Sequence, residues 1–173
     1  MHNPYSPFND ISRIAGNVDL SAFDCGDPDF NDYIMNEAYI DQQENFSVTY
    51  IGFIGGKPAA FLSLVAAAYK TASLDRTELG KYSYRSVPAV KIARVAVDNA
   101  FKGKGCGRVL IEYAFYIAKK VRQLVGCRLV VTDALPERIG WYEGFGFKLS
   151  SQHVKAENRK NYPMHATLLP DGR

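Results

Sequence analysis

The segment of this chain best suited to chemistry is a turn in which glycines alternate with basic side chains, Lys102-Gly103-Lys104-Gly105-Cys106-Gly107-Arg108. It follows a strand-like run, Ile92 to Val97, and precedes a helix-like run from Gly107 to about Leu124. The first amides of a helix have no internal partner and the helix dipole is positive there, so a glycine turn at this place can close on an anion. We therefore predict that the turn holds a phosphate ester; the alternative is a plain structural turn.

The spacing of the glycines limits which phosphate ester this turn can hold. A P-loop needs two glycines five residues apart followed by Lys-Ser or Lys-Thr, and the sequence contains no such segment. A dinucleotide-binding turn has the spacing Gly-x-Gly-x-x-Gly, whereas Gly103, Gly105 and Gly107 give Gly-x-Gly-x-Gly. Neither common nucleotide motif therefore explains the turn.

A second distinctive segment lies further along the chain. The aromatic and glycine-rich run Trp141-Tyr142-Glu143-Gly144-Phe145-Gly146-Phe147 follows a strand-like stretch, residues 127–134. The distance from the glycine turn to Tyr142 suits one helix, one strand and one short helix in between.

Together these two segments resemble the GNAT N-acetyltransferase family. Lys102, Gly105 and Gly107 match its basic-x-x-Gly-x-Gly pyrophosphate loop, with Lys102 where the family usually has Arg or Gln. The run from Trp141 is similar to the family's Phe-Tyr-Glu-x-x-Gly-Phe signature. The resemblance implies acetyl-CoA as co-substrate and direct attack of a primary amine on its thioester. It implies that the cofactor is bound by Val95, Ala96, Val97, Lys102, Gly103, Lys104, Gly105, Cys106, Gly107 and Arg108.

The resemblance also assigns a general acid. The family has a tyrosine beside the sulfur at the place of Tyr142, and a tyrosine close to the leaving thiolate can donate a proton to it. Outside such a motif, a tyrosine in an aromatic turn is most often a core residue. The general base stays open among several side chains: Asp98, Asp133, Glu143, His2, His153 and His165.

We predict a single α/β domain over residues 1–173, because the length suits one domain and strand-like and helix-like runs alternate. The resemblance implies a GNAT fold, with a mixed, mostly antiparallel central sheet that splays at the acetyl-CoA site and is flanked by helices. The patterns predict helices over 28–43 and from 107 to about 124, and a short helix from Pro136. They predict strands over 46–54, 59–69, 87–98, 127–134 and 165–169, with a hairpin turn at Gly55-Gly56 and a weak helix or loop over 71–86.

Charge is unevenly distributed along the chain. Residues 1–46 carry nine acidic side chains and one basic side chain, whereas residues 81–128 carry eleven basic and two acidic side chains. The basic segment suits the phosphates of CoA or a polyanion such as RNA; the alternative at Lys119, Lys120 and Arg122 is a solvated helix end. No apolar run is long enough to span a membrane, no signal peptide is visible and the three cysteines lack metal-ligand spacing, so we expect a cytoplasmic protein without a metal site.

The N-terminal segment narrows the resemblance further. The run from Leu20 to Gly26, with Phe30, Tyr33 and Ala38 after it, looks like the opening of GNAT toxins that acetylate aminoacyl-tRNA. That subgroup implies a toxin-antitoxin pair with a ribbon-helix-helix antitoxin. The other interpretation is a general N-acetyltransferase of proteins, peptides or small amines. A remote third interpretation is an inactive module that binds CoA or RNA. The sequence leaves the acceptor open, and it leaves open whether the protein is a homodimer.

Overall fold

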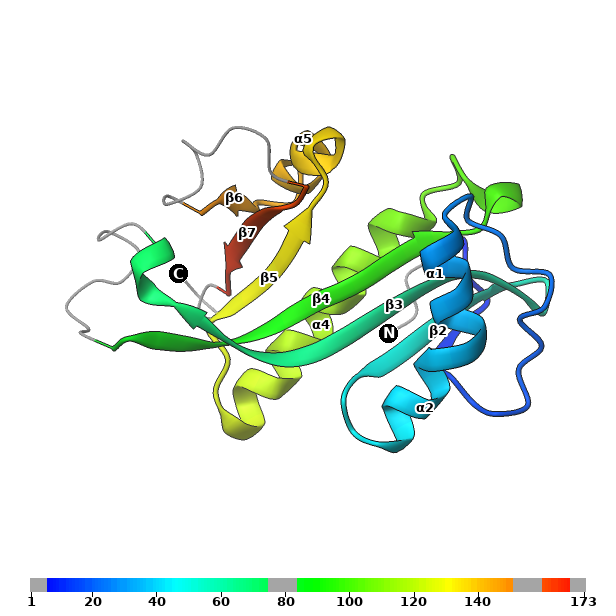
Figure 1. Ribbon diagram of the computed structural model, residues 1–173, viewed down its shortest axis with the longest axis horizontal. Helices are drawn as coiled ribbons and strands as arrows, with labels where there is room; N and C mark the ends of the chain where they lie inside the picture. Colours follow the sequence, from blue (N-terminus) through cyan, green and yellow to red (C-terminus); the bar gives the residue numbers. More distant parts are fainter. Residues whose placement is uncertain (1–5, 75–83, 151–159, 169–173) are drawn as a thin grey trace. The chain divides into compact units, whose positions relative to one another are not determined.

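The computed structural model describes residues 6–74, 84–150 and 160–168 (Figure 1). The chain divides into two compact units. The first consists of Met1–Val65 and Ala93–Ala114, and the second of Ala66–Ile92 and Phe115–Arg173. Two long strands and the long central helix each contribute residues to both units.

Seven strands form one sheet in the order β1-β2-β3-β4-β5-β7-β6. Strand β4 runs parallel to β5, while the β1–β2, β2–β3, β5–β7 and β6–β7 pairs are antiparallel. The predicted mixed, mostly antiparallel sheet is therefore confirmed. The strands are β1 (Asp10–Arg13), β2 (Val48–Ile54), β3 (Lys57–Lys70), β4 (Ser86–Val97), β5 (Leu129–Ala134), β6 (Lys148–Leu149) and β7 (Tyr162–Thr167).

The predicted hairpin joins β2 to β3. Gly55 and Gly56 have φ angles of 59° and 75°, a left-handed conformation that glycine adopts without the steric cost of a side chain. Two strands were not predicted. The four residues of β1 are mostly exposed, and β6 has two residues, so neither carries a readable apolar alternation.

The predicted helix over 28–43 forms, but its middle turn is wider than an α-helix. It consists of α1 (Pro28–Asp32), a π-helical turn (Tyr33–Glu37) and α2 (Ala38–Gln43). Asp27 caps the first amides and Pro28 occupies the first helical position, as the sequence indicates. The apolar side of this helical segment buries Tyr33, Ile34 and Ala38, as the sequence indicates.

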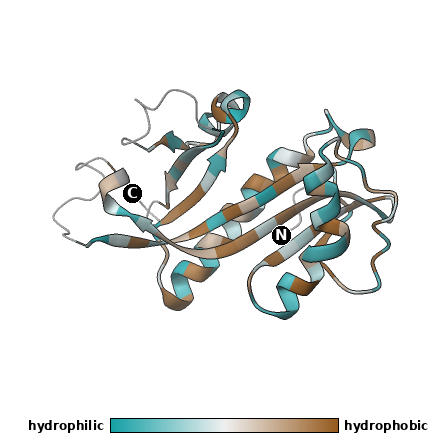
Figure 2. Ribbon diagram, in the orientation of Figure 1, coloured by the Kyte–Doolittle hydropathy of each residue, from teal (hydrophilic) through white to brown (hydrophobic). Residues whose placement is uncertain are grey.

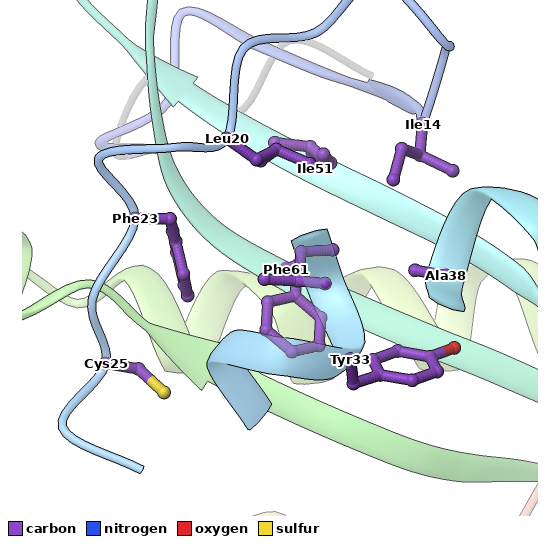
Figure 3. Packing of buried hydrophobic residues seen from close by; sticks show 9 residues of the cluster. Ile14, Leu20, Phe23, Cys25, Tyr33, Ala38, Ile51 and Phe61 are labelled. Carbon is purple, nitrogen blue, oxygen red and sulfur yellow. The ribbon is translucent and has the colours of Figure 1, made fainter. Parts of the chain in front are cut away.

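The core of the first unit lies between this helical segment and one face of the sheet. Figure 3 shows Phe23 and Tyr33 on two sides of Phe61, with ring centroids 5.6 and 6.1 Å from that ring. Ile51 of β2 joins this cluster, whereas the neighbouring Tyr50 contacts Tyr113 on the opposite face, at 5.1 Å between ring centroids. Because consecutive strand residues point to opposite faces, the helices of this unit cover both faces of its strands.

The long helix α4 (Cys106–Val125) contains Tyr113 and confirms the predicted central helix. Its fully buried positions are Leu110, Ile111, Ala114 and Ala118. The sequence predicts a buried face at spacings of four, three, four and three residues, namely Leu110, Ala114, Ile117, Val121 and Leu124. Ile117 and Val121 are half-buried, and the prediction was wrong at Leu124, which is 81% exposed. A repeat of 3.5 residues drifts by about 20° per heptad against the helical period of 3.6, so the stripe leaves the packed face near the helix end. In the described part of the chain, no helix is long and apolar enough to cross a membrane.

The second unit has its own core and bears the second motif. Leu74, Val87, Ala89, Leu129 and Val131 form a buried cluster. After β5, a 3-10 turn (Pro136–Arg138) leads into α5 (Ile139–Glu143), which confirms the short helix predicted from Pro136.

Predicted strand boundaries in the second unit move by a few residues. Strand β5 begins at Leu129 rather than 127, and β7 covers Tyr162–Thr167 rather than 165–169. Within the predicted weak segment 71–86, Thr71–Ser73 is a 3-10 turn and Ser86 already belongs to β4, while residues 75–83 lie outside the described part. Figure 2 shows hydrophobic residues (brown) along the middle of β3 and hydrophilic residues (teal) on α1.

Candidate active site

The end of β4 carries the first predicted cofactor-binding residues, Val95, Ala96 and Val97. Among the described residues, β4 pairs with β5 only through Ala89–Ile92 and Leu129–Thr132. The strand continues for five further residues beyond that pairing, and burial falls at the same point. Ile92 is fully buried, Ala93 is exposed, and Val95–Val97 are half-buried. The last residues of β4 therefore combine ordered strand backbone with partial access to solvent, as backbone that binds a ligand requires.

The glycine turn follows directly and has the geometry of an anion cradle. Gly103 and Gly105 have φ angles of 78° and 80°, and a side-chain carbon placed on either would meet nothing within 4 Å. Helix α4 begins at Cys106, and the amide of Val109 is the first to bond back, to the carbonyl of Gly105 at 3.2 Å. The amides of the first three helical residues precede that bond, so they are available to an anion at the positive end of the helix dipole.

The three basic side chains of the turn contact other parts of the protein. Lys102 Nζ donates to the carbonyl of Cys25 at 2.9 Å. Lys104 Nζ lies 4.9 Å from the centre of the Phe101 ring, and Arg108 Nε donates to Glu112 Oε1 at 3.1 Å. The anion-binding capacity of the turn therefore rests mainly on backbone amides. An exposed pair such as Arg108–Glu112 contributes only ~0–1 kcal/mol and is easily given up.

Asp98 holds the start of the turn, a role that the sequence did not indicate. Its Oδ2 accepts from the amide of Asp24 at 2.9 Å, and its Oδ1 accepts from the amide of Ala100 at 2.8 Å. Asn99 adds two bonds to Asp24, from its amide to the carbonyl at 2.8 Å and from its side chain to Oδ2 at 3.1 Å. The N-terminal Asp24-Cys25-Gly26 segment is thus a support for the glycine turn. Both Asp98 oxygens are used in it, which argues against Asp98 as the general base.

Cys106 contributes only its backbone to this surface. Its side chain is 2% exposed, its thiol lies 3.7 Å from the Phe101 carbonyl, and burial raises the pKa of the thiol above its ordinary value. The thiol is therefore protonated at neutral pH and faces the interior.

Tyr142, the predicted general acid, lies in the second unit within an aromatic cluster. Its ring centroid is 4.9 Å from that of Trp141 and 5.3 Å from that of Phe147. Tyr142 is 6% exposed, and this burial raises its pKa above the ordinary value. A side-chain hydrogen bond with Thr132 and the charge of Arg138 act in the opposite direction. The phenol is consequently protonated at neutral pH, as a proton donor must be.

The other candidate general bases have different surroundings. Asp133 Oδ2 is paired with Lys91 Nζ at 2.6 Å on the surface, and Glu143 is exposed. His165 is 2% exposed and its ring lies 5.7 Å from that of Tyr69. His2 and His153 lie outside the described residues. In residues 6–74, 84–150 and 160–168 there is no group of three or more His, Cys, Asp or Glu that could hold a metal ion.

The comparison with protein families decides which family the chain belongs to. A family model described as an acetyltransferase (GNAT) domain matches residues 44–149, which include β4, the glycine turn and Tyr142. The chain belongs to this family. It is an acetyl-CoA-dependent acetyltransferase. The glycine turn fits that co-substrate, because free amides and open space meet at one helix N-terminus.

Individual GNAT relatives resemble this chain over nearly its whole length. A tRNA-acetylating toxin of Mycobacterium tuberculosis is 24% identical over 158 residues, which cover 91% of this chain and 89% of the relative. The structure of AtaT complexed with acetyl-methionyl-tRNAfMet has a TM-score of 0.79 at 21% identity, covering 89% of this chain and 92% of that one. A further bacterial toxin structure has a TM-score of 0.81 at 16% identity, covering 91% of this chain and 89% of the other. These structural likenesses confirm the GNAT fold.

Proposed function

We propose that this acetyltransferase acts on the α-amino group of aminoacyl-tRNA, as a toxin of a toxin-antitoxin pair. The observation that carries the proposal is the extent of the likeness to a tRNA-acetylating toxin. The family model covers residues 44–149, whereas the likeness to that toxin covers 158 residues of the 173. It must therefore include much of the segment before residue 44, where α1, the π-helical turn and α2 lie.

The proposed mechanism gives each predicted residue one task. The amides of Cys106, Gly107 and Arg108 bind the pyrophosphate of the co-substrate, with Lys102, Gly103, Lys104 and Gly105 shaping the turn. The backbone of Val95, Ala96 and Val97 binds the thioester arm, and an amide there stabilises the negative charge that develops on the carbonyl. The acceptor amine attacks that carbonyl, and Tyr142 donates its proton to the leaving thiolate. The α-amino group of an aminoacyl ester is easily deprotonated, so the mechanism needs no strong base.

Arg94 supports an acceptor that carries phosphate. Its guanidinium lies over the ring of Tyr33, 3.8 Å from the ring centre, and the side chain is half-buried. Neither of the ion pairs among the described residues involves Arg94. A guanidinium that is held over a ring and has no carboxylate partner can bind a phosphate through two parallel N–H donors. Arg94 lies on β4 next to Val95, so we assign the acceptor's phosphate to it.

The proposal extends to partners and setting. The solved neighbours include AtaT bound to the C-terminus of the antitoxin AtaR and a KacTA-DNA complex. We infer that this chain likewise has an antitoxin partner of the ribbon-helix-helix class, and that it works in the cytoplasm, where aminoacyl-tRNA is found. We also infer that residues 1–173 act as one catalytic domain, because β3, β4 and α4 each continue from one compact unit into the other. For the oligomeric state, we propose a homodimer.

The experiment that tests this function uses radiolabelled acetyl-CoA. The purified protein is incubated with it and with charged tRNA, uncharged tRNA, a protein extract or small amines in separate reactions. We expect label in the charged tRNA alone, and we expect mild base, which cleaves the aminoacyl ester, to release it from the RNA. Label that appears only in proteins or small amines would overturn the tRNA assignment while leaving the enzyme an acetyltransferase.

A variant of Arg94 tests the acceptor site separately. Arg94→Met should raise KM for aminoacyl-tRNA and reduce the salt dependence of its binding by about one phosphate contact, while the affinity for acetyl-CoA stays the same. Arg13→Met is the matched control, since Arg13 is an exposed residue of β1. If Arg94→Met and Arg13→Met behave alike, Arg94 has no part in acceptor binding.

A further inference from the structure

Tyr33 is the residue over which the Arg94 guanidinium lies. The guanidinium carbon is 3.8 Å from the centre of the Tyr33 ring, and both residues belong to the first compact unit. Tyr33 is 1% exposed, whereas Arg94 is half-buried. A cation over an aromatic ring is held more strongly where water is excluded, so this contact is suited to fix the position of the arginine.

The backbone and the hydroxyl of Tyr33 are both held in place. Its amide donates to the carbonyl of Asp29, and its carbonyl accepts from the amide of Ala38 at the end of the π-helical turn. Its hydroxyl lies 3.2 Å from Ser47 Oγ and 3.5 Å from Thr49 Oγ1, within hydrogen-bonding distance of both. The tyrosine is therefore fixed at the two ends of its side chain.

The hydroxyl of Tyr33 belongs to a row of buried hydroxyls that continues into the sheet. Thr49 Oγ1 on β2 is hydrogen-bonded to Ser63 Oγ on β3 at 2.7 Å, and Tyr33, Ser47, Thr49 and Ser63 are each at most 6% exposed. A buried hydroxyl that loses its partner is costly, so the ring cannot swing out of this place without a penalty. Phe61 packs beside the ring at 6.1 Å between centroids, and in Figure 3 the Tyr33 hydroxyl points away from Phe61.

A rigid ring changes what Arg94 can do. A free arginine side chain loses much rotamer freedom when it binds a ligand, and a side chain that is already held loses less. The face of the Tyr33 ring attracts the charge of the guanidinium but carries no oxygen acceptor, so the N–H donors remain available to phosphate oxygens.

We propose that Tyr33 is a positioning residue for the acceptor, because it holds the Arg94 guanidinium in the orientation that binds the acceptor's phosphate. Tyr33 acts through Arg94 and does not touch the acceptor itself. The inference rests on the proposed function, which assigns that phosphate to Arg94. Loss of the Tyr33 ring should therefore weaken acceptor binding and leave the chemical step unchanged.

Two variants of Tyr33 separate positioning from stability. Tyr33→Leu removes the ring, so KM for aminoacyl-tRNA should rise ~3- to 30-fold, the range that corresponds to the energy of such a contact, while kcat is unchanged. Tyr33→Phe keeps the ring and loses the hydroxyl, so it should lower the melting temperature by a few degrees and restore KM to within about twofold of wild type. An equal rise of KM in both variants would show that Tyr33 acts through stability alone and would overturn the inference.

Phe30→Leu is the matched control, since Phe30 of α1 packs on the same Phe61 ring at 6.3 Å between centroids. Its KM should stay at the wild-type value. In an Arg94→Met background, Tyr33→Leu should have no further effect on KM. A further rise there, as large as the rise with Arg94 present, would mean that Tyr33 does not act through Arg94.

A measurement without any acceptor tests the contact itself, including the case in which Tyr33→Leu does not fold. The Nε–H proton signal of Arg94, identified by its absence in Arg94→Met, should be shifted upfield by the ring current in the wild-type protein and in Tyr33→Phe. A wild-type signal at the position of a free arginine would overturn the inference. An upfield signal together with no label in charged tRNA would support the positioning of Arg94 and reject tRNA as the acceptor, so the two failures are distinguishable.

Discussion

The glycine turn and the Tyr142 cluster do their proposed work with different parts of the chain. The turn presents backbone amides, and its three basic side chains contact the Cys25 carbonyl, the Phe101 ring and Glu112. The Tyr142 cluster depends on one side-chain hydroxyl and on the aromatic rings that bury it. A site made of backbone is sensitive to conformation and tolerant of side-chain exchange. A site that depends on one side-chain hydroxyl is instead sensitive to exchange of that side chain.

The largest effect should come from changing the conformation of the turn. Gly105→Val places a β-branched residue at a φ of 80°, where such residues are strongly disfavoured, and fills the open space over the amides. We expect acetyl-CoA binding to be lost in calorimetric titration, as strain of ~1–3 kcal/mol adds to the loss of the cradle. Gly55→Val is the matched control, because Gly55 also has a positive φ and open surroundings but lies in the β2–β3 hairpin. Normal titration by a folded Gly105→Val protein would contradict the cradle.

Removing one oxygen atom tests the other region. Tyr142→Phe should lower kcat by roughly 10²–10⁴, the range for a positioned acid, and leave the dissociation constant for acetyl-CoA unchanged. On one preparation, kcat is measured by steady-state release of free CoA thiol, and the dissociation constant is measured by titration. An unchanged turnover would remove Tyr142 from the mechanism and leave it as a core residue of the aromatic cluster.

The side chain of Lys102 should contribute much less to the affinity for acetyl-CoA than the sequence motif implies. Lys102→Met removes the hydrogen bond to the Cys25 carbonyl, so we expect a loss of about 1 kcal/mol in the free energy of unfolding. The affinity for acetyl-CoA should change less than about threefold, since ~0.6 kcal/mol corresponds to such a factor. Lys57→Met, at the exposed start of β3, is the control. A large loss of affinity in Lys102→Met alone would show that Lys102 leaves Cys25 for the phosphate.

The smallest expected effect is the pH response of Tyr142. Burial raises the pKa of Tyr142 above the ordinary value of ~10. The contribution of the protonated phenol to the stability of the folded protein is therefore fully present below pH ~10, and it is lost only as the pH rises through the higher pKa of the folded state. Turnover should therefore show no loss from this group between neutral pH and about pH 10. The profile of kcat, compared with that of Tyr142→Phe, checks this. A loss near neutral pH that Tyr142→Phe abolishes would contradict a raised pKa.

The two motifs and most elements could be predicted because they follow local rules. Glycine alternation, a capping Asp27 before Pro28 and the Gly55-Gly56 turn are readable from neighbouring residues. The π-helical turn could not be predicted, because Tyr33–Glu37 has ordinary helix-forming residues. The helix widens there, where Tyr33 and Ile34 pack into the core. The exposure of Leu124 likewise depends on where the packed face of α4 ends.

The sequence by itself determined the family, the place of the glycine turn and the position of the tyrosine, because each depends on residue types at fixed spacing. The tertiary structure decided which atoms of those residues are available. It joined Asp24 to Asp98, 74 residues away along the chain, directed Lys102 to Cys25, and bonded the Thr132 hydroxyl to the Ile92 carbonyl. Such contacts are made between segments distant in the chain, and spacing along a sequence carries no record of which donor meets which acceptor once the chain has folded.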